Sequence, residues 1–135
     1  MAGGIPSSLT GDTVVIWVYD FETAHQTTPK KDTYCIWVYE GSSTVNQDYI
    51  DQFSDFMLLN YTNTVDQGSE AFLGFLERNR NRPILWCVCE SGYIRAPAVG
   101  LAVSSLLGDA GSFSDLYREY RDCYDHQLLW KLRPY

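Results

Sequence analysis

Residues 84–108 read ILWCVCESGYIRAPAVGLAVSSLLG, and this stretch carries the strongest structural signal in the chain. Its first part, ILWCV (84–88), is a short apolar run, which is typical of a strand buried on both faces. Residues 98–107 are apolar on nearly all sides of a helix, so that helix should be heavily buried. Pro97 suits the first helical turn and Gly108 suits the end of the helix. The stretch therefore predicts a strand, a loop and a buried helix.

Three other segments are predicted as strands. VIWVYD (15–20) and CIWVYE (35–40) are both β-branched and aromatic, and they lie 20 residues apart. This echo is too short for a repeat protein and indicates two neighbouring strands with similar packing needs, buried on both faces. FSDFMLLNY (53–61) is a third strand. Residues 21–32 form a short helix or loop that carries the first crossover.

The remaining segments favour helices. SEAFLGFLERNR (69–80) offers Ser69 as an N-cap and a helical apolar stripe, and Pro83 follows it. LYREYRDC and DHQLLWKL near the C-terminus are predicted as two short helices, and GDAGSFSD (108–115) as a loop before them.

Strands that alternate with helices predict an α/β fold, with a mostly parallel central sheet flanked by helices in three layers. We expect one domain over residues 13–135, after a flexible lead-in at 1–12. Ligands bind such sheets at the carboxyl ends of the strands, which is where Cys89 falls.

Composition narrows the classes of function. The chain has 135 residues, 45% hydrophobic and 20% charged, which suits one soluble globular domain. Its net charge of −7 argues against nucleic-acid and membrane-surface partners, because both need a positive footprint. No apolar run approaches the roughly 20 residues of a membrane helix. The N-terminus lacks the features of a secretion signal, so we expect a cytoplasmic protein with reduced thiols.

Neither the basic cluster nor the cysteines and histidines are interpreted as a binding site. NRNRPI (79–84) is the nearest basic cluster, and cations favour helix C-termini, so we interpret it as a solvated helix end. The four cysteines have no zinc-ligand spacing, and the two histidines, His25 and His126, lie elsewhere. We therefore expect no metal and no cofactor.

The segment between strand and helix has the parts of an anion site. A strand-to-helix loop directs several backbone N–H groups into one concavity, and the helix dipole adds partial positive charge. Cys89, at the base of this loop, would feel the same field, which favours a nucleophilic thiolate. Arg95 can direct two N–H donors onto phosphate oxygens. Gly92 lets the backbone turn close to a ligand.

CESGYIR (89–95) resembles the C-x5-R signature of cysteine-dependent protein tyrosine phosphatases. Over residues 34–132 the pattern resembles the small dual-specificity-like phosphatases of bacteria and their phages. The resemblance implies hydrolysis of phosphate monoesters through a phosphocysteine intermediate, with a phosphorylated protein or a small phosphate ester as partner. Cys89 would be the nucleophile and Arg95 the clamp. The phosphate-binding loop would comprise Glu90, Ser91, Gly92, Tyr93, Ile94 and Arg95, with Tyr93 and Ile94 as a pocket wall.

The sequence departs from this family at three places. Val88 stands where the family has a histidine, and Ala96 stands where it has a serine or threonine that helps the cysteine leave. The family's general acid is an aspartate on the loop after the third strand, where Asp66 is the nearest candidate. Asp66 could equally cap a helix. Asp122 and Asp125 could also approach the site from the C-terminal segment.

Three alternatives follow from these departures. One is a catalytically impaired pseudophosphatase that binds phosphate or a phosphoprotein. Another is a rhodanese-like domain, because Cys89, Glu90, Arg95 and Pro97 also resemble the rhodanese-fold phosphatases and related arsenate reductases, with Cys87 as a resolving thiol. In the last, Cys89 is a buried small hydrophobic residue and Glu90 pairs with Arg95. The sequence does not indicate the oligomeric state.

Overall fold

The computed structural model describes residues 14–40, 45–60 and 69–132. The expected lead-in at 1–12 and the candidate acid Asp66 lie outside the described residues. Among the helices that are described, none has the length and apolar character needed to cross a bilayer.

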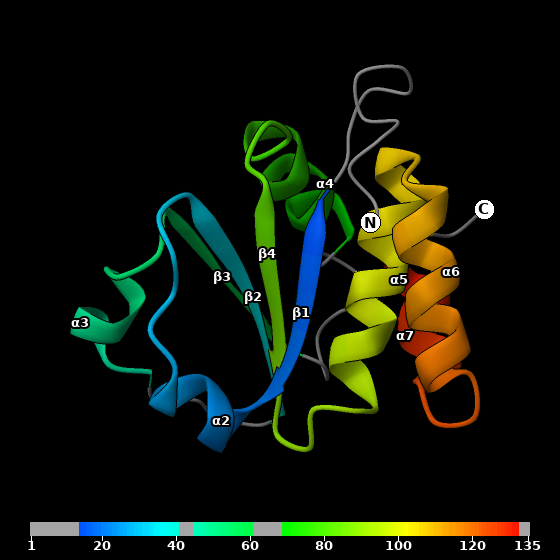
Figure 1. The fold of residues 1–135 in the computed structure, drawn as a ribbon, viewed down its shortest axis with the longest axis horizontal. Coiled ribbons are helices and arrows are strands. Elements are labelled where there is room, and N and C mark those ends of the chain that lie inside the picture. The colour runs from blue at the N-terminus through cyan, green and yellow to red at the C-terminus, as the bar shows by residue number, and fades with distance from the viewer. Residues whose placement is uncertain (1–13, 41–44, 61–68, 133–135) are drawn as a thin grey trace.

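The described strands form one all-parallel, four-stranded sheet in the order β1-β4-β2-β3 (Figure 1). They are β1 (Val15–Asp20), β2 (Thr33–Tyr39), β3 (Asp55–Asn60) and β4 (Ile84–Cys89). This confirms the α/β fold with a parallel sheet. The two echoing strands β1 and β2 are not neighbours, however, because β4 pairs with both of them.

Burial differs between the central strands and β1. β2 is buried along nearly its whole length, and β4 is buried from its second residue, as their apolar sequences predict. β1 contradicts the prediction, because Val15 and Trp17 are 51% and 50% exposed. The reason is that β1 lies at the edge of the sheet. Its aromatic and β-branched residues still favour a strand there, but fewer neighbouring side chains cover them.

Six described helices surround the sheet. They are α2 (Phe21–Gln26), α3 (Gln47–Ile50), α4 (Ser69–Arg78), α5 (Arg95–Leu107), α6 (Ala110–Tyr120) and α7 (His126–Leu132). In Figure 1, α5, α6 and α7 stand together on one side of the sheet, and α2 and α3 lie on the other side. Helix α5 begins three residues earlier than the predicted helix body, so Pro97 lies in its first turn as expected.

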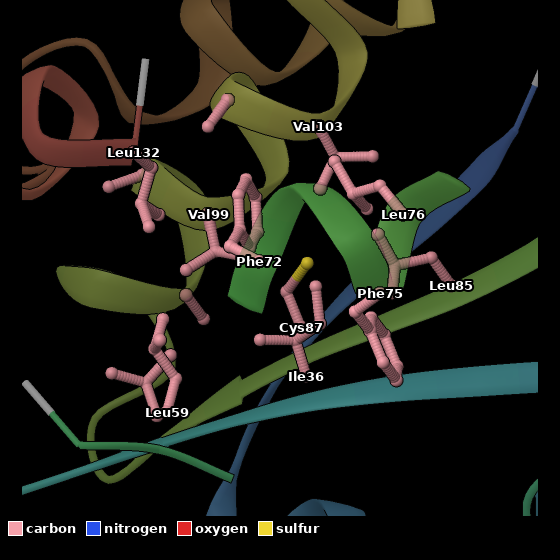
Figure 2. Packing of buried hydrophobic residues seen from close by; sticks show 14 of the residues in the cluster. Ile36, Leu59, Phe72, Phe75, Leu76, Leu85, Cys87, Val99, Val103 and Leu132 are labelled. Atoms are coloured by element: carbon pink, nitrogen blue, oxygen red, sulfur yellow. The ribbon is translucent and has the colours of Figure 1, made fainter. Parts of the chain in front are cut away.

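Two hydrophobic clusters hold these elements together. The larger one joins sheet residues such as Ile36 and Leu85 to residues of α4, α5 and α7 such as Phe72, Val99 and Leu132 (Figure 2). The smaller one contains mainly aromatic and β-branched residues: Ala24, Cys35, Trp37, Tyr49, Phe53, Trp86 and Val88. Because side chains alternate along a strand, Cys87 and Cys89 belong to the first cluster and Val88 to the second.

The loop predicted at 108–115 is wrong, because α6 already begins at Ala110. Gly108 adopts a left-handed conformation with φ of 77° and ends α5. Asp109 then caps α6 by accepting the Ser112 N–H at 3.1 Å. Asp109 also accepts the Val14 N–H at 3.1 Å, which ties α6 to the start of β1. These contacts outweigh the low helix propensity of the glycine and serines in the first turn.

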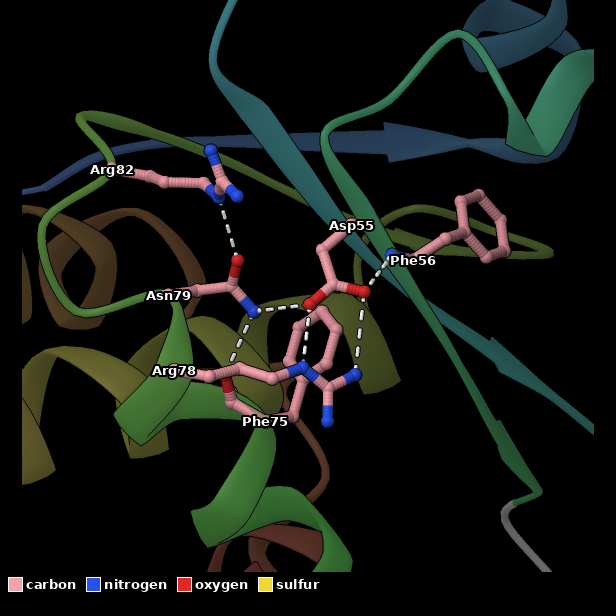
Figure 3. Close-up of polar contacts among 6 residues, drawn as sticks. All are labelled: Asp55, Phe56, Phe75, Arg78, Asn79 and Arg82. Atoms are coloured by element: carbon pink, nitrogen blue, oxygen red, sulfur yellow. Dashed lines mark hydrogen bonds and ion pairs between the residues drawn. The ribbon is translucent and has the colours of Figure 1, made fainter.

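The arginines of the basic cluster at the end of α4 are exposed or half-exposed, as expected of a solvated helix end, but Asn79 within it is buried and belongs to a structural network (Figure 3). Asn79 is only 1% exposed, and its Nδ2 donates to Asp55 Oδ2 and to the Phe75 carbonyl, both at 2.8 Å. Arg78 Nε lies 2.7 Å from the same carboxylate. Arg82 Nε donates to Asn79 Oδ1 at 2.8 Å. These groups hold α4 to the start of β3.

This network predicts an acid-sensitive contribution to stability. Burial acts to raise the pKa of Asp55, but hydrogen bonds from Arg78 and Asn79 outweigh it and the pKa lies below its usual value. A depressed folded-state pKa gives stability that is present above about pH 4 and is lost as pH falls through the folded pKa. We expect Asp55→Asn to lower the free energy of unfolding at pH 7 by about 1–2 kcal/mol.

The measurement is urea unfolding of both proteins between pH 7 and pH 2.5. The difference between Asp55→Asn and the wild type should narrow as the pH falls below about 4. Asp115→Asn is the matched control, because Asp115 and its partner Arg118 are both largely exposed. That control should change little, and an equal loss in both variants would contradict the prediction.

Candidate functional site

The candidate site lies at the carboxyl edge of the sheet, where β4 passes into α5. Cys89 is the last residue of β4, and Arg95 is the first residue of α5. In Figure 1 this connection is the yellow-green loop below the sheet. The sequence prediction is confirmed in this respect: the loop joins a buried strand to a buried helix and holds Cys89 at its base.

The Cys89 sulfur is the point on which the loop converges. Its Sγ accepts the N–H of Gly92 and the N–H of Ala96, each at 3.2 Å. The Ser91 hydroxyl lies 3.9 Å away. Cys89 is only 2% exposed, so these contacts are formed largely away from water. Two N–H donors at the start of a helix stabilise negative charge on this sulfur.

Gly92 allows the loop to close over the end of β1. It adopts φ of +80°, a conformation that glycine reaches without steric cost. A Cβ at this position would lie 2.7 Å from the Asp20 backbone nitrogen. The loop therefore packs directly against the β1 backbone, and this contact explains why the sequence needs glycine there.

Asp20, although close to the loop, serves the fold rather than the site. Its carboxylate accepts the Thr23 N–H at 2.6 Å and caps α2. Hydrogen bonds from the Thr23 side chain and backbone lower the pKa of Asp20. A carboxylate with a lowered pKa does not supply a proton at neutral pH, so Asp20 is a poor candidate for the general acid.

Two carboxylates flank the Arg95 guanidinium. Glu40, directly after β2, has Oε1 3.5 Å from Nη1. Asp125, directly before α7, has Oδ2 4.0 Å from Nε. The structural alternative named Glu90 as the partner of Arg95, but these ion pairs come from two other parts of the chain. Asp125 approaches the site, as the sequence allowed, whereas Asp122 is exposed on the surface.

The two large side chains of the loop face outward. Tyr93 is 54% exposed and Ile94 is 38% exposed. Both are accessible to a ligand, and their role as a pocket wall stays a prediction. Glu90 is also exposed.

The departures from the phosphatase pattern have clear structural positions. Val88 is fully buried in the cluster on the opposite face of the sheet from Cys89. Ala96 supplies a backbone N–H to the sulfur but has no hydroxyl to offer. The Ser91 hydroxyl lies 3.9 Å from the sulfur. Sequence reasoning placed Ser91 in the loop but gave it no part in catalysis.

Among the other cysteines, Cys87 is fully buried. Burial, and then the charge of Cys89, raise the pKa of Cys87 well above its usual value. A neutral buried thiol is a poor nucleophile, so Cys87 is unsuited to act as a resolving thiol.

Tyr120 at the end of α6 was missed by sequence reasoning. Burial raises its pKa, with smaller effects from Glu119, Cys123 and Cys89.

The described part of the chain contains no group of three or more His, Cys, Asp or Glu side chains suited to a metal ion. When the chain is compared with known proteins, no family model matches it, and no curated protein or solved structure matches it either. What bears on the function of this chain is therefore the geometry of the loop between β4 and α5.

Proposed function

We propose that this chain is a protein tyrosine or dual-specificity phosphatase-like thiol phosphatase that hydrolyses phosphate monoesters, with a phosphatase-like phosphate loop at residues 89–95. The observation that carries the proposal is the pair of N–H groups, from Gly92 and Ala96, that converge on Cys89 Sγ at 3.2 Å. A sulfur held in this way at the start of a 13-residue helix favours both a thiolate and a bound anion. Arg95, on the first turn, adds a two-pronged donor for phosphate oxygens.

The proposed reaction has two steps. The Cys89 thiolate attacks phosphorus, the bond from phosphorus to the ester oxygen breaks, and the leaving oxygen takes a proton from a general acid. Asp66 is proposed for that proton, and it lies outside the described residues. Water then attacks the phosphocysteine, the phosphorus–sulfur bond breaks, and the thiolate and inorganic phosphate are released. The substrate is a phosphorylated protein or a small phosphate ester.

A binding module with slow turnover is the second candidate, and Ala96 favours it. Without a hydroxyl at that position, expulsion of the thiolate from phosphocysteine lacks its usual donor, unless Ser91 supplies one. The rhodanese-like alternative is left without the resolving thiol that the sequence suggested for it, because Cys87 is fully buried and burial raises its pKa.

The test measures turnover and binding on the same protein. Hydrolysis of p-nitrophenyl phosphate is followed from the first turnover, and iodoacetamide alkylation of Cys89 is followed with and without phosphate or vanadate. A Cys123→Ser background removes the exposed thiol. Cys35 and Cys87 are 0% exposed and burial raises the pKa of both, so neither competes with Cys89 for the reagent.

A phosphatase gives steady turnover, and phosphate slows its alkylation. A burst followed by slow release indicates that phosphocysteine accumulates, as the absent hydroxyl predicts. Protection without turnover identifies a binding module. An alkylation rate that neither anion changes, together with no turnover, would overturn both functions.

A further inference from the structure

Asp125 connects three parts of the molecule at the edge of the loop. Its N–H donates to the Ile94 carbonyl at 2.8 Å, and so joins the segment before α7 to the loop. Its Oδ1 accepts the Leu128 N–H at 3.0 Å and caps α7. Its Oδ2 lies 4.0 Å from Arg95 Nε. One residue thus contacts the start of α7, the end of the loop and one side of the guanidinium.

Glu40 approaches Arg95 in a different way. Its side chain is 56% exposed, whereas that of Asp125 is 13% exposed. Its Oε1 lies 3.5 Å from Arg95 Nη1. An exposed, flexible glutamate is screened by water and imposes little order on its partner. The Asp125 carboxylate is mostly shielded from water and belongs to a residue held by a helix cap and a backbone hydrogen bond, so it imposes more order on Arg95 than Glu40 does.

We propose that Asp125 is a positioning residue for the Arg95 guanidinium, and that it orders the phosphate clamp before a ligand binds. This inference depends on the proposed function, in which Arg95 binds phosphate oxygens. An arginine side chain loses rotamer freedom when it clamps an anion, and a partner that already holds it reduces that cost. Misplacing a clamp by about 1 Å also lowers the rate of a reaction at the bound group.

A purely electrostatic role of Asp125 and a positioning role of Asp125 predict opposite effects on anion binding. Removing a negative charge beside an anion site strengthens anion binding if only Coulomb interactions act. Removing a residue that orders the clamp weakens anion binding. Asp125→Asn separates the two effects, because asparagine caps a helix as well as aspartate does and has almost the same size.

The experiment compares the wild type, Asp125→Asn and Glu40→Gln in the Cys123→Ser background. Inorganic phosphate is titrated, and the concentration that halves the rate of Cys89 alkylation is measured. We expect Asp125→Asn to raise this concentration by about 3–10-fold, equivalent to part of one lost charge-assisted contact. Glu40→Gln, which removes the same charge without removing order, should leave it unchanged or lower it. Where p-nitrophenyl phosphate is turned over, KM should rise in Asp125→Asn and not in Glu40→Gln.

Urea unfolding checks that each variant is folded, and Asp125→Ser, another capping residue, replaces Asp125→Asn if that variant does not fold. Phosphate affinity in the Asp125 variant that is equal to or tighter than that of the wild type, with normal protection in the wild type, would overturn the inference and leave the proposed function standing. No protection in the wild type itself would overturn both.

Discussion

Under the proposed function, replacing Cys89 with serine is expected to lower the rate of p-nitrophenyl phosphate hydrolysis by about 10⁴-fold or more, because a serine hydroxyl is not ionised at neutral pH. The variant keeps its fold. A hydroxyl at this position accepts the same two N–H groups, those of Gly92 and Ala96, that the sulfur accepts at 3.2 Å. We expect the free energy of unfolding to change by no more than about 1 kcal/mol.

The control for this variant is Cys123→Ser. Cys123 is exposed, whereas Cys89 is buried at the base of the loop. Cys123→Ser should retain wild-type turnover and stability, so that the loss in Cys89→Ser is assigned to the nucleophile. Hydrolysis by Cys89→Ser at the wild-type rate would show that the activity does not pass through phosphocysteine.

Replacing Gly92 with alanine has the second large expected effect, on both stability and binding. The new Cβ would lie 2.7 Å from the Asp20 nitrogen and 3.1 Å from the Asp20 Cα, which are backbone atoms that cannot rotate away. The variant also places a non-glycine residue at φ of +80°. Together these lower the free energy of unfolding by about 2–4 kcal/mol in urea titration. Because the loop must move, the Gly92 N–H leaves Cys89 and phosphate protection is lost.

Gly108→Ala provides a closely matched control. Gly108 has nearly the same backbone conformation, with φ of +77°, but a Cβ there meets no atom within 4 Å. Gly108→Ala should lower the free energy of unfolding only by the cost of the left-handed conformation, about 1 kcal/mol. Phosphate should protect Cys89 from alkylation as it does in the wild type. Equal losses of stability in the two variants would mean that the contact with Asp20 contributes nothing.

The parts of the fold that sequence predicts best are those in which local and tertiary preferences agree. The strand ending at Cys89, the turn at Gly92 and the stop at Gly108 were all anticipated from residue type, and each has the expected backbone conformation. The start of α6 was not, because it depends on Asp109, which caps the helix while also binding Val14 from the other end of the chain. The exposure of Val15 and Trp17 was missed because strand order is not encoded in the strand itself.

The candidate site also combines residues that local sequence identifies with residues that only the tertiary fold brings together. Cys89, Gly92 and Arg95 are close in sequence, and their spacing identifies the loop without knowledge of the rest of the fold. The carboxylates that lie beside Arg95 come from distant parts of the sequence: Glu40 follows β2, and Asp125 precedes α7. Sequence allowed Asp125 to approach but gave no sign that it would meet Arg95, because that contact depends on how α7 packs against α5.

The strand order also determines when the site can form on a growing chain. Within the described sheet β1 pairs only with β4. Its backbone therefore cannot form these hydrogen bonds until residues 84–89 have been synthesised. Contacts over such a sequence separation are slow to form. During that interval the newly made β1, with its half-exposed Val15 and Trp17, presents an open apolar strand to other molecules. The strand that ends at Cys89 is therefore also the strand that covers this edge of β1.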